Sequence, residues 1–538
     1  MLVILLSLPP TYKIHAMTDG SISSSDSKAS AGPVRWLLPS IADLIFLALL
    51  GLLVFTPLSV RLLGDAGIGW HIRTGQNILA SHAIPNVDSF SSTMNGKPWL
   101  AWEWLYDVKV GGLDSAFGLN GVVWFTALVI AAVFGAMFQF LVRRGTNLLA
   151  ALVLVLLAIS ASTIHFLARP HVLSWLFTLV WFWILASTER GSMAGDGLRS
   201  RWLWVLPASM LLWVNVHGGF LLGFVLIAIF WLGSMWTWLS SSENRIEDSL
   251  AKIAARKRVR VLTSVGLISA LASLVNPYGW KLHAHVYSYL SNRFLIDHID
   301  EFQSPNFHGI AQKCFLALLL LSVAALIARG RKLPLSHILV VLFAVYAGLY
   351  ASRNIPISAI LLGMVIGPLL PSIGVAESFS QRMLAVETRM RGHLWPLAAI
   401  AFTFALAANG GRIGSRQWMD AHFDPQRMPV QAVDYLRSQD VTAPILAPDY
   451  WGGYLIYRLY PQAQVVVDDR HDLYGEQFLR SYLKLLHAEE GWEEFLREHP
   501  ASYIVVPRKS PLATVLMESP GWKKAYADDV AFVFKAAD

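Results

Sequence analysis

The chain is a succession of long apolar runs separated by short polar stretches. A membrane-spanning helix needs about 20 consecutive apolar residues, and eleven segments approach that length. We expect spanning helices at 36–63, 119–141, 148–167, 171–187, 202–216, 219–239, 260–275, 313–328, 335–351, 355–370 and 393–409. Two pairs are almost continuous, joined at 169–171 and at 217–219. We expect tight hairpin turns there, although breaks within bent helices would give the same pattern.

The pattern changes after about residue 410, where short apolar runs alternate with amphipathic ones. The short runs predict strands at 443–447, 465–467, 503–506 and 531–535. The amphipathic runs predict helices at 452–460, 476–499 and 511–518. Strands that alternate with helices indicate a small α/β layer with a largely parallel sheet. The expected fold class is therefore a mainly α, polytopic membrane protein with a C-terminal α/β domain.

Composition agrees with a membrane protein. Of the 538 residues 55% are hydrophobic and 15% are charged, whereas soluble domains carry about 25% charged residues. The net charge of +7 does not indicate a nucleic-acid partner, because most Lys and Arg lie in short loops between apolar runs. The single Cys314 has no partner for an internal disulfide.

The positions of the basic residues predict the orientation of the chain. Lys and Arg gather in alternate loops, at Arg143, Arg144, Arg190, Arg199, Arg201, Arg245, Lys252, Arg256, Lys257, Arg258, Arg260, Arg329, Arg331, Lys332, Arg382, Arg389 and Arg391. Short loops rich in basic residues stay in the cytoplasm. We expect a disordered cytoplasmic segment at 1–35, with Met17 an alternative start, and a transmembrane domain at 36–410. Its first outer loop is 64–118, and an extracytoplasmic α/β domain spans 411–538.

With this orientation, the junctions that carry His, Asn and Asp side chains all face outward. They follow the odd-numbered helices and contain Asp65, Trp70, His71, Arg169, His171, Asn215, His217, Asn276, Tyr278 and Arg353. The even-numbered loops hold basic residues with few His or aromatic clusters. A protein in which loops served only topology would have no reason to gather these residue types at one surface. We therefore expect a single outward-facing site.

Two residue types suggest the chemistry of that site. Acidic residues next to a membrane helix are often functional, and Asp65 is such a residue; Asp88 and Glu103 lie in the same loop. Arg169 and Arg353 lie at outer junctions, where the charge rule disfavours Arg. Arg binds phosphate through two parallel hydrogen bonds, so both are candidates for phosphate binding; the alternative is that they reach toward lipid headgroups.

Metal binding is not expected, since no His spacing matches a motif such as His-Glu-x-x-His; a divalent metal has no support in the sequence. Asp469 and Arg470 follow the predicted strand 465–467, and ligands of α/β sheets bind at the carboxyl ends of strands. An extracytoplasmic Asp468–Asp469 pair would meet no nucleotide sugar. We expect these residues to have a structural or acceptor-contacting role.

Several motifs resemble those of the GT-C superfamily of membrane glycosyltransferases, more specifically a largely uncharacterised bacterial GT-C-like family. They are Asp65…Trp70-His71…Thr74-Gly75, Pro85…Asp88-Ser89-Phe90-Ser91, Trp102-Glu103-Trp104-Leu105, 212–220, Asn276-Pro277-Tyr278-Gly279, Trp451-Gly452-Gly453-Tyr454 and 467–474. The resemblance covers nearly the whole chain after residue 36. It implies a bacterial inner-membrane enzyme of the cell envelope.

The resemblance implies inverting transfer of a sugar from a polyprenyl-phosphate donor to an extracytoplasmic glycan, lipid or protein acceptor. A carboxylate must accept the proton of the attacking hydroxyl, and Asp65 is the first candidate. The leaving phosphate needs positive charge and hydrogen-bond donors, and Arg169, Arg353 and His217 are placed nearest to it. GT-C proteins commonly have two adjacent acids here, but Ala66 follows Asp65. Glu103 and Asp88 therefore remain alternative bases, and His71 a further catalytic candidate.

Two other classes remain open. A lipid-linked glycan ligase or polymerase has a similar membrane architecture but relies on Arg and His instead of a carboxylate. A non-catalytic scaffold descended from an enzyme would also retain these motifs. A transporter is disfavoured, because charged residues are nearly absent from the middle of the predicted helices, where coupling sites usually lie.

Overall fold

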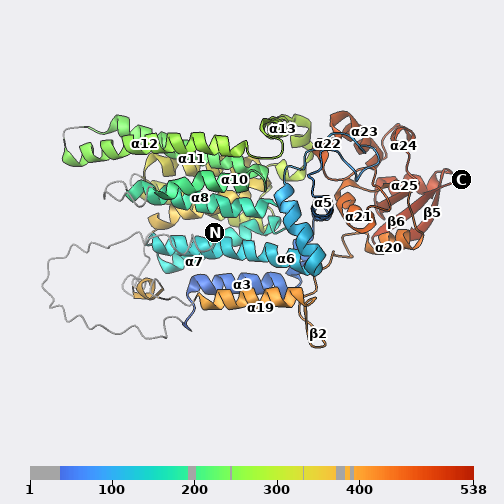
Figure 1. Ribbon diagram of the computed structural model, residues 1–538, viewed down its shortest axis with the longest axis horizontal. Coiled ribbons are helices and arrows are strands. Elements are labelled where there is room, and N and C mark those ends of the chain that lie inside the picture. The colour runs from blue at the N-terminus through green and yellow to red at the C-terminus, as the bar shows by residue number, and fades with distance from the viewer. Residues whose placement is uncertain are drawn as a thin grey trace.

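The computed structural model describes residues 37–191, 201–242, 245–330, 333–370, 382–387, 390 and 393–537. The expected disordered segment 1–35 lies outside this range. Figure 1 shows a bundle of long helices aligned with the long axis of the molecule and, at one end, a domain of strands and shorter helices formed by the C-terminal residues. The predicted fold class, a helical membrane protein with a C-terminal α/β domain, is confirmed.

Each of the eleven predicted apolar segments contains a helix. The bundle helices are α3 (Ile41–Phe55), α4 (Leu58–Leu62), α6 (Trp104–Arg143), α7 (Leu148–Ser162), α8 (His171–Gly191), α10 (Val205–Trp213), α11 (Leu221–Ser240), α12 (Ile246–Ser273), α15 (Ile310–Arg329), α16 (Leu335–Tyr350), α17 (Ile355–Ile366) and α19 (Leu394–Ala408). Among the described residues, six helical segments are long and apolar enough to cross a membrane. The chain is thus a multi-pass membrane protein, while the count of eleven crossings stays a prediction.

The junctions at 169–171 and 217–219 are turns. In Figure 1 α7 and α8 occupy the same stretch of the long axis, as do α10 and α11, so neither pair is one bent helix. α12 begins well before the predicted apolar segment 260–275, and its charged first turns project beyond the other helices. Large apolar side chains on the outer face of α15, such as Leu320 and Ile327, are exposed, as lipid contact requires.

The segment 64–118, predicted to be the first outer loop, contains helical structure. It contains α5 (Ile68–Ser81) and the first turns of α6, which is kinked at Gly118 with φ of 61°. α5 packs by close backbone contact: a Cβ at Gly69 would collide with the carbonyl of Gly453, and one at Gly75 with that of Asp107. Glycines on two sides of α5 therefore allow this helix to pack closely against α21 and α6.

The C-terminal domain contains a four-stranded sheet in the order β3-β4-β6-β5. Its strands are β3 (Ile445–Leu446), β4 (Tyr503–Pro507), β5 (Trp522–Ala527) and β6 (Ala531–Ala536). Only the β3–β4 pair is parallel; β4–β6 and β5–β6 are antiparallel. The expectation of a largely parallel sheet is wrong, because β5 was not foreseen and it joins β6 through a short connection that only an antiparallel pair permits.

The helices of this domain are α20 (Val430–Ser438), α21 (Asp449–Leu459), α22 (His471–Tyr474), α23 (Glu476–Leu486), α24 (Glu493–Glu498) and α25 (Pro511–Glu518). A small hairpin of β1 (Arg412–Ile413) and β2 (Arg416–Gln417) follows α19 at the end of the bundle, apart from the sheet. The single helix expected at 476–499 is thus two helices. The predicted strand 465–467 forms only isolated bridges, in which Val465 pairs with Ile445 on one side and with Ser91 on the other.

A buried ion triad fastens this domain to the segment before α6. Arg470 donates to both carboxylate oxygens of Asp468, at 2.8 and 2.7 Å, and to Asp88 Oδ1 at 2.8 Å. The three side chains are at most 2% exposed. The guanidinium also lies over the Trp99 ring, 4.6 Å from its centroid, an attractive arrangement for a desolvated cation.

We predict that Arg470→Met strongly destabilises the protein, because it leaves two buried carboxylates without a counter-charge. Removing one partner of a buried ion pair typically costs about 3–5 kcal/mol. Thermal unfolding in detergent should show a large decrease in Tm. Arg497→Met is the matched control, since Arg497 is 73% exposed in its pair with Glu494 and such pairs contribute little. Equal Tm values for the two variants would contradict a structural role for the triad.

Candidate functional site

Asp65, Arg169 and Asp469 form one connected group at the end of the bundle that faces the C-terminal domain. Arg169 Nε donates to Asp65 Oδ2 at 2.9 Å, and Nη2 donates to Asp65 Oδ1 at 2.6 Å. The same Nη2 donates to Asp469 Oδ2 at 2.5 Å. Trp70 Nε1 donates to the other oxygen of Asp469 at 2.9 Å. One guanidinium therefore joins an acid that follows α4 to an acid of the C-terminal domain.

The backbone around Asp65 is shaped to fit this group. Gly67 N donates to Asp65 Oδ1 at 2.8 Å, and a Cβ at Gly67 would collide with the Arg169 guanidinium and with Asp469 Oδ2. Among the described residues, Asp65 Oδ2 accepts a hydrogen bond only from Arg169 Nε. Its side chain is 31% exposed, so one carboxylate oxygen keeps a lone pair that a substrate can reach.

Burial raises the pKa of the Asp469 carboxyl to about 6. The charge of Arg169 lowers it, and the neighbouring carboxylate of Asp65 raises it again. Asp65 and Asp469 both pair with Arg169 but differ in burial: the Asp65 side chain is 31% exposed and that of Asp469 is 12% exposed.

Glu103 lies between two imidazoles in a second group. Its Oε2 is 3.8 Å from His71 Nε2, and its Oε1 is 3.7 Å from His217 Nε2. Both distances exceed hydrogen-bond length. His71 is fully buried and its Nε2 has no hydrogen-bond partner. The first group is adjacent, because the Trp70 ring stacks on His71 with a centroid distance of 3.6 Å.

The tautomers of His71 and His217 follow from the hydrogen bonds at their Nδ1 atoms, the ring nitrogens that face away from Glu103. His71 Nδ1 is 2.6 Å from Asp107 Oδ1, so it carries the proton when Asp107 is ionised and its Nε2 is left with a lone pair. His217 Nδ1 accepts from Gly219 N at 3.0 Å and lies 2.8 Å from Ser174 Oγ. Neutral His217 therefore carries its proton on Nε2.

The electrostatics favour neutral groups here. Burial raises the pKa of the Glu103 carboxyl to about 8, although Arg169 and Arg353 act to lower it. Burial, and then the charge of Arg169, hold the pKa of His71 well below its usual range. Burial and the charge of Arg353 do the same to the pKa of His217. The influence of both arginines on these groups indicates that they lie around one region.

Arg353 and His171 lie in a neighbouring set of contacts. Arg353 Nη1 is 3.9 Å from Glu301 Oε1, and its guanidinium lies over the Phe302 ring at 4.5 Å. His171 Nε2 is 2.9 Å from the carbonyl oxygen of His165. No direct contact joins either residue to Asp65 within the part of the chain that the structure describes.

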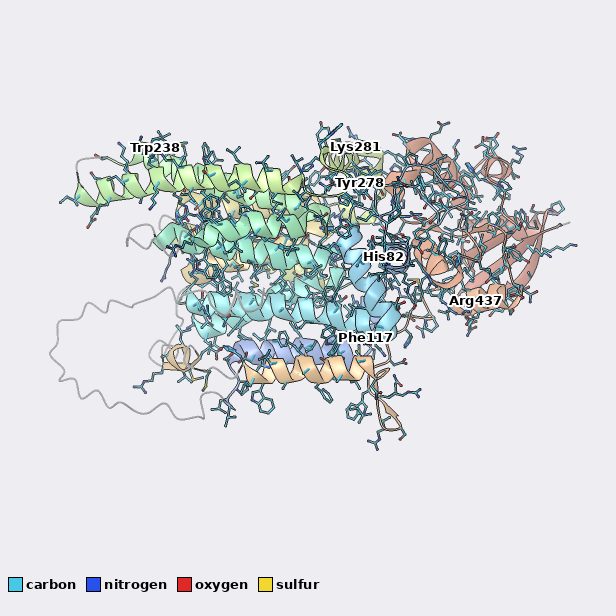
Figure 2. The ribbon with its side chains drawn as sticks, in the orientation of Figure 1. His82, Phe117, Trp238, Tyr278, Lys281 and Arg437 are labelled. Atoms are coloured by element: carbon cyan, nitrogen blue, oxygen red, sulfur yellow. The ribbon has the colours of Figure 1, made fainter. Side chains whose placement is uncertain are left out.

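Five further candidates are fully engaged by the protein itself. Asp88 and Arg470 belong to the buried triad. Asn215 accepts from Trp104 Nε1 at 2.7 Å and donates to the carbonyls of Leu211 and Val275. Asn276 closes its own turn. Tyr278, which Figure 2 labels at the junction of bundle and C-terminal domain, bridges Ala101 N and the Pro85 carbonyl. These contacts are structural, and the predicted substrate contacts of these residues stay predictions.

Sequence reasoning missed Asp107 and Ser174, which hold the two histidines. One signal was present for Asp107: it lies four residues after Glu103, and residues at that spacing share a helix face. Nothing in the sequence links Ser174 to His217. Among the described residues no group of three His, Cys, Asp or Glu side chains is arranged to hold a metal ion.

We predict that Glu103→Gln raises the Tm relative to the native protein, by an amount that grows with pH. The folded protein holds the Glu103 proton up to a pKa of about 8, against a usual value of 4.5. Between these values the unfolded state binds fewer protons, so the stability of the native protein falls as pH rises. The Tm difference should increase between about pH 5 and about pH 8 and then level off. A pH-independent difference would contradict the burial of a protonated carboxyl.

No family model matches the chain, and none of the curated proteins matches it. Solved structures do. The apo oligosaccharyltransferase of Archaeoglobus fulgidus is 13% identical with a TM-score of 0.51, over 87% of this chain and 69% of that one. Archaeal oligosaccharyltransferase AglB from the same organism, in complex with an inhibitory peptide and a dolichol-phosphate, is 12% identical with a TM-score of 0.52, over 86% and 68%.

ArnT from Cupriavidus metallidurans, bound to undecaprenyl phosphate, is also similar, with 13% identity over 92% of this chain and 96% of that one, at a lower TM-score of 0.45. The fold assignment rests on the two oligosaccharyltransferase structures, which match 87% and 86% of this chain. The chain therefore has the fold of these two archaeal oligosaccharyltransferase structures.

Proposed function

We propose that this protein is a membrane glycosyltransferase that moves a sugar from a polyprenyl-phosphate-linked donor to an extracytoplasmic acceptor. The observation that carries the proposal is the Asp65 carboxylate, held in two-point contact by Arg169 at the end of the helix bundle. In that position it is oriented, partly exposed and next to a cation. These are the requirements of a general base that works beside a leaving phosphate.

In this reaction the acceptor oxygen forms a bond to the anomeric carbon while the bond from that carbon to the lipid phosphate breaks. The hydroxyl proton passes to Asp65 Oδ2, whose remaining lone pair is available. Attack from the face opposite the phosphate inverts the anomeric centre. The phosphate leaves with the bonding electrons and needs no proton, only nearby donors.

Two arginines and a neutral histidine of the same region supply those donors. Among the described residues nothing is hydrogen-bonded to Arg169 Nη1, which leaves one edge of the guanidinium for a phosphate oxygen. His217 Nε2 carries a proton in the neutral ring, and Arg353 is close enough to alter the pKa of His217. The AglB structure with the same fold contains a dolichol-phosphate, which supports a lipid phosphate as the group bound here. A site at the end of the bundle is also within reach of a lipid headgroup.

A second candidate is a lipid-linked glycan ligase or polymerase in which Arg and His carry the chemistry. It is favoured by the saturation of Asp65 Oδ1, which already accepts from Gly67 N and Arg169 Nη2. Loss of activity in Arg353→Lys, together with tolerance of Asp65→Asn, would support this candidate over the first.

We predict that Asp65→Asn lowers the transfer rate by about 10²–10⁴-fold, the usual contribution of a general base. The measurement is release of undecaprenyl phosphate from a panel of undecaprenyl-phosphate hexoses and pentoses, in proteoliposomes supplied with bacterial envelope extract. Asp420→Asn, an exposed acid near β2, is the matched control and should retain the native rate.

An undiminished rate in Asp65→Asn would remove Asp65 from the role of base. If the native protein releases undecaprenyl phosphate from no member of the panel, the proposed donor class fails.

A further inference from the structure

The second polar group, around Glu103, has a geometry that the transfer step at Asp65 leaves unexplained. His71 Nε2, the two Glu103 oxygens and His217 Nε2 converge, but the gaps of 3.8 and 3.7 Å are too long for hydrogen bonds. His71 is completely buried, and an unpaired buried polar atom costs about 1–3 kcal/mol. An unpaired buried polar atom therefore calls for an explanation, and a bound group is one.

The hydrogen-bonding capacity of the three groups is complementary. When Asp107 is ionised, the proton of the neutral His71 ring lies on Nδ1 and Nε2 only accepts. His217 Nε2–H only donates, because its other nitrogen accepts from Gly219 N. A Glu103 carboxyl accepts when ionised and also donates when protonated. An acceptor, a group able to donate and accept, and a donor thus lie side by side.

Aromatic rings flank this space. The Trp70 ring stacks on His71. Trp102 is half-buried, and its ring lies against Gly218, so closely that a Cβ there would stand 2.6 Å from Trp102 Cζ3. Trp102 also contacts His285 and Tyr289 edge-on, with centroid distances of 5.6 and 6.2 Å. Large rings next to a few directed polar groups are the usual lining of a small-molecule site.

A metal ion fits this arrangement less well than an organic ligand. Metal ligation by imidazole requires an unprotonated nitrogen, whereas the Gly219 hydrogen bond leaves His217 Nδ1 as the acceptor and places the proton on Nε2. An inorganic anion fits no better, since His71 offers a lone pair and Glu103 a carboxyl.

We propose that His71, Glu103 and His217 form a sugar-binding subsite that holds two adjacent hydroxyls of a pyranose or furanose ring. One hydroxyl donates to His71 Nε2 and accepts from the protonated Glu103 Oε2; the next accepts from His217 Nε2–H and donates to Glu103 Oε1. A sugar hydroxyl can donate one hydrogen bond and accept another. An acceptor, a carboxyl and a donor placed side by side satisfy both capacities of two adjacent hydroxyls. The subsite deepens the proposed function and rests on it, since it holds the sugar beside Asp65.

Asp107 is a positioning residue of the subsite. As a carboxylate, Asp107 accepts the proton of His71 Nδ1 and so leaves the lone pair on Nε2, toward Glu103. In Asp107→Asn the amide NH₂ donates to Nδ1, which moves the imidazole proton to Nε2 and reverses the polarity of His71. The fold around the ring is otherwise kept, because Asn has the same shape as Asp.

The test is direct binding of free monosaccharides to the detergent-purified full chain by saturation-transfer difference NMR. The probes are glucose, galactose, mannose, N-acetylglucosamine and arabinose, with tetrahydropyran-2-methanol as a ring without adjacent hydroxyls. We expect signals from the ring protons of at least one sugar and none from the control compound. Glu103→Leu and His71→Phe should weaken the signal at least about fivefold, which corresponds to roughly 1 kcal/mol of lost binding.

Three comparisons decide the outcome. Asp107→Asn should weaken binding and move the ¹⁵N resonances of His71 from the Nδ1–H to the Nε2–H tautomer, a change that a purely structural role would not produce. Asp65→Asn should keep sugar binding, so loss of transfer there with intact binding separates the two proposals. Asp420→Asn is the surface control for both measurements, and Tm values identify any variant that fails to fold.

The proposal is overturned if no sugar in the panel gives a signal with the native protein, or if Glu103→Leu and His71→Phe bind as the native protein does. Zn²⁺ that raises the native Tm but not the Tm of His71→Phe would replace the sugar subsite with a metal site.

Discussion

The buried ion triad of Asp88, Arg470 and Asp468 is the contact on which the rest of the outer end depends. Three charges without solvent are tolerated only when hydrogen bonds and counter-charges compensate them, and here each carboxylate is met by the guanidinium. The triad joins residues almost 400 positions apart in the chain. It fastens the C-terminal domain to the segment that carries α5, and so places Asp469 next to Arg169.

The residues around Arg470 each contact a different element. Asp468 accepts from Tyr474, and Asp469 accepts from Arg169 and Trp70. His471 contacts Asp449 at the start of α21, and Asp472 contacts His285 on α13 (Trp280–Ser291). The segment 468–472 thus links the C-terminal domain both to the residues around Arg169 and to the helix that carries His285. The C-terminal domain is therefore part of the polar site and does more than cover the membrane end.

Two acids of this region have opposite environments. Asp65 is paired with a guanidinium and partly exposed, whereas Glu103 is buried with no bonded partner and with a pKa raised to about 8. The stacked rings of Trp70 and His71 lie between them in the chain of contacts. In a region of low dielectric constant such neighbours differ strongly in proton affinity. One carboxylate is suited to accept a proton in the proposed transfer, and the other to bind hydroxyls as a neutral acid.

The sequence by itself determined the helical segments, the change to strands and helices after residue 410, and the candidate residues that include Asp65 and Arg169. Apolar run length and alternation are local properties, so they can be read without knowledge of the partner segments. Tertiary structure alone decided that α5 is a packed helix, that most of the sheet is antiparallel, that Asp88 and Arg470 are buried together, and that Asp107 holds His71. The roles of these side chains come from contacts across tens to hundreds of residues, and a carboxylate in the sequence looks the same whether Arg, imidazole or water will face it.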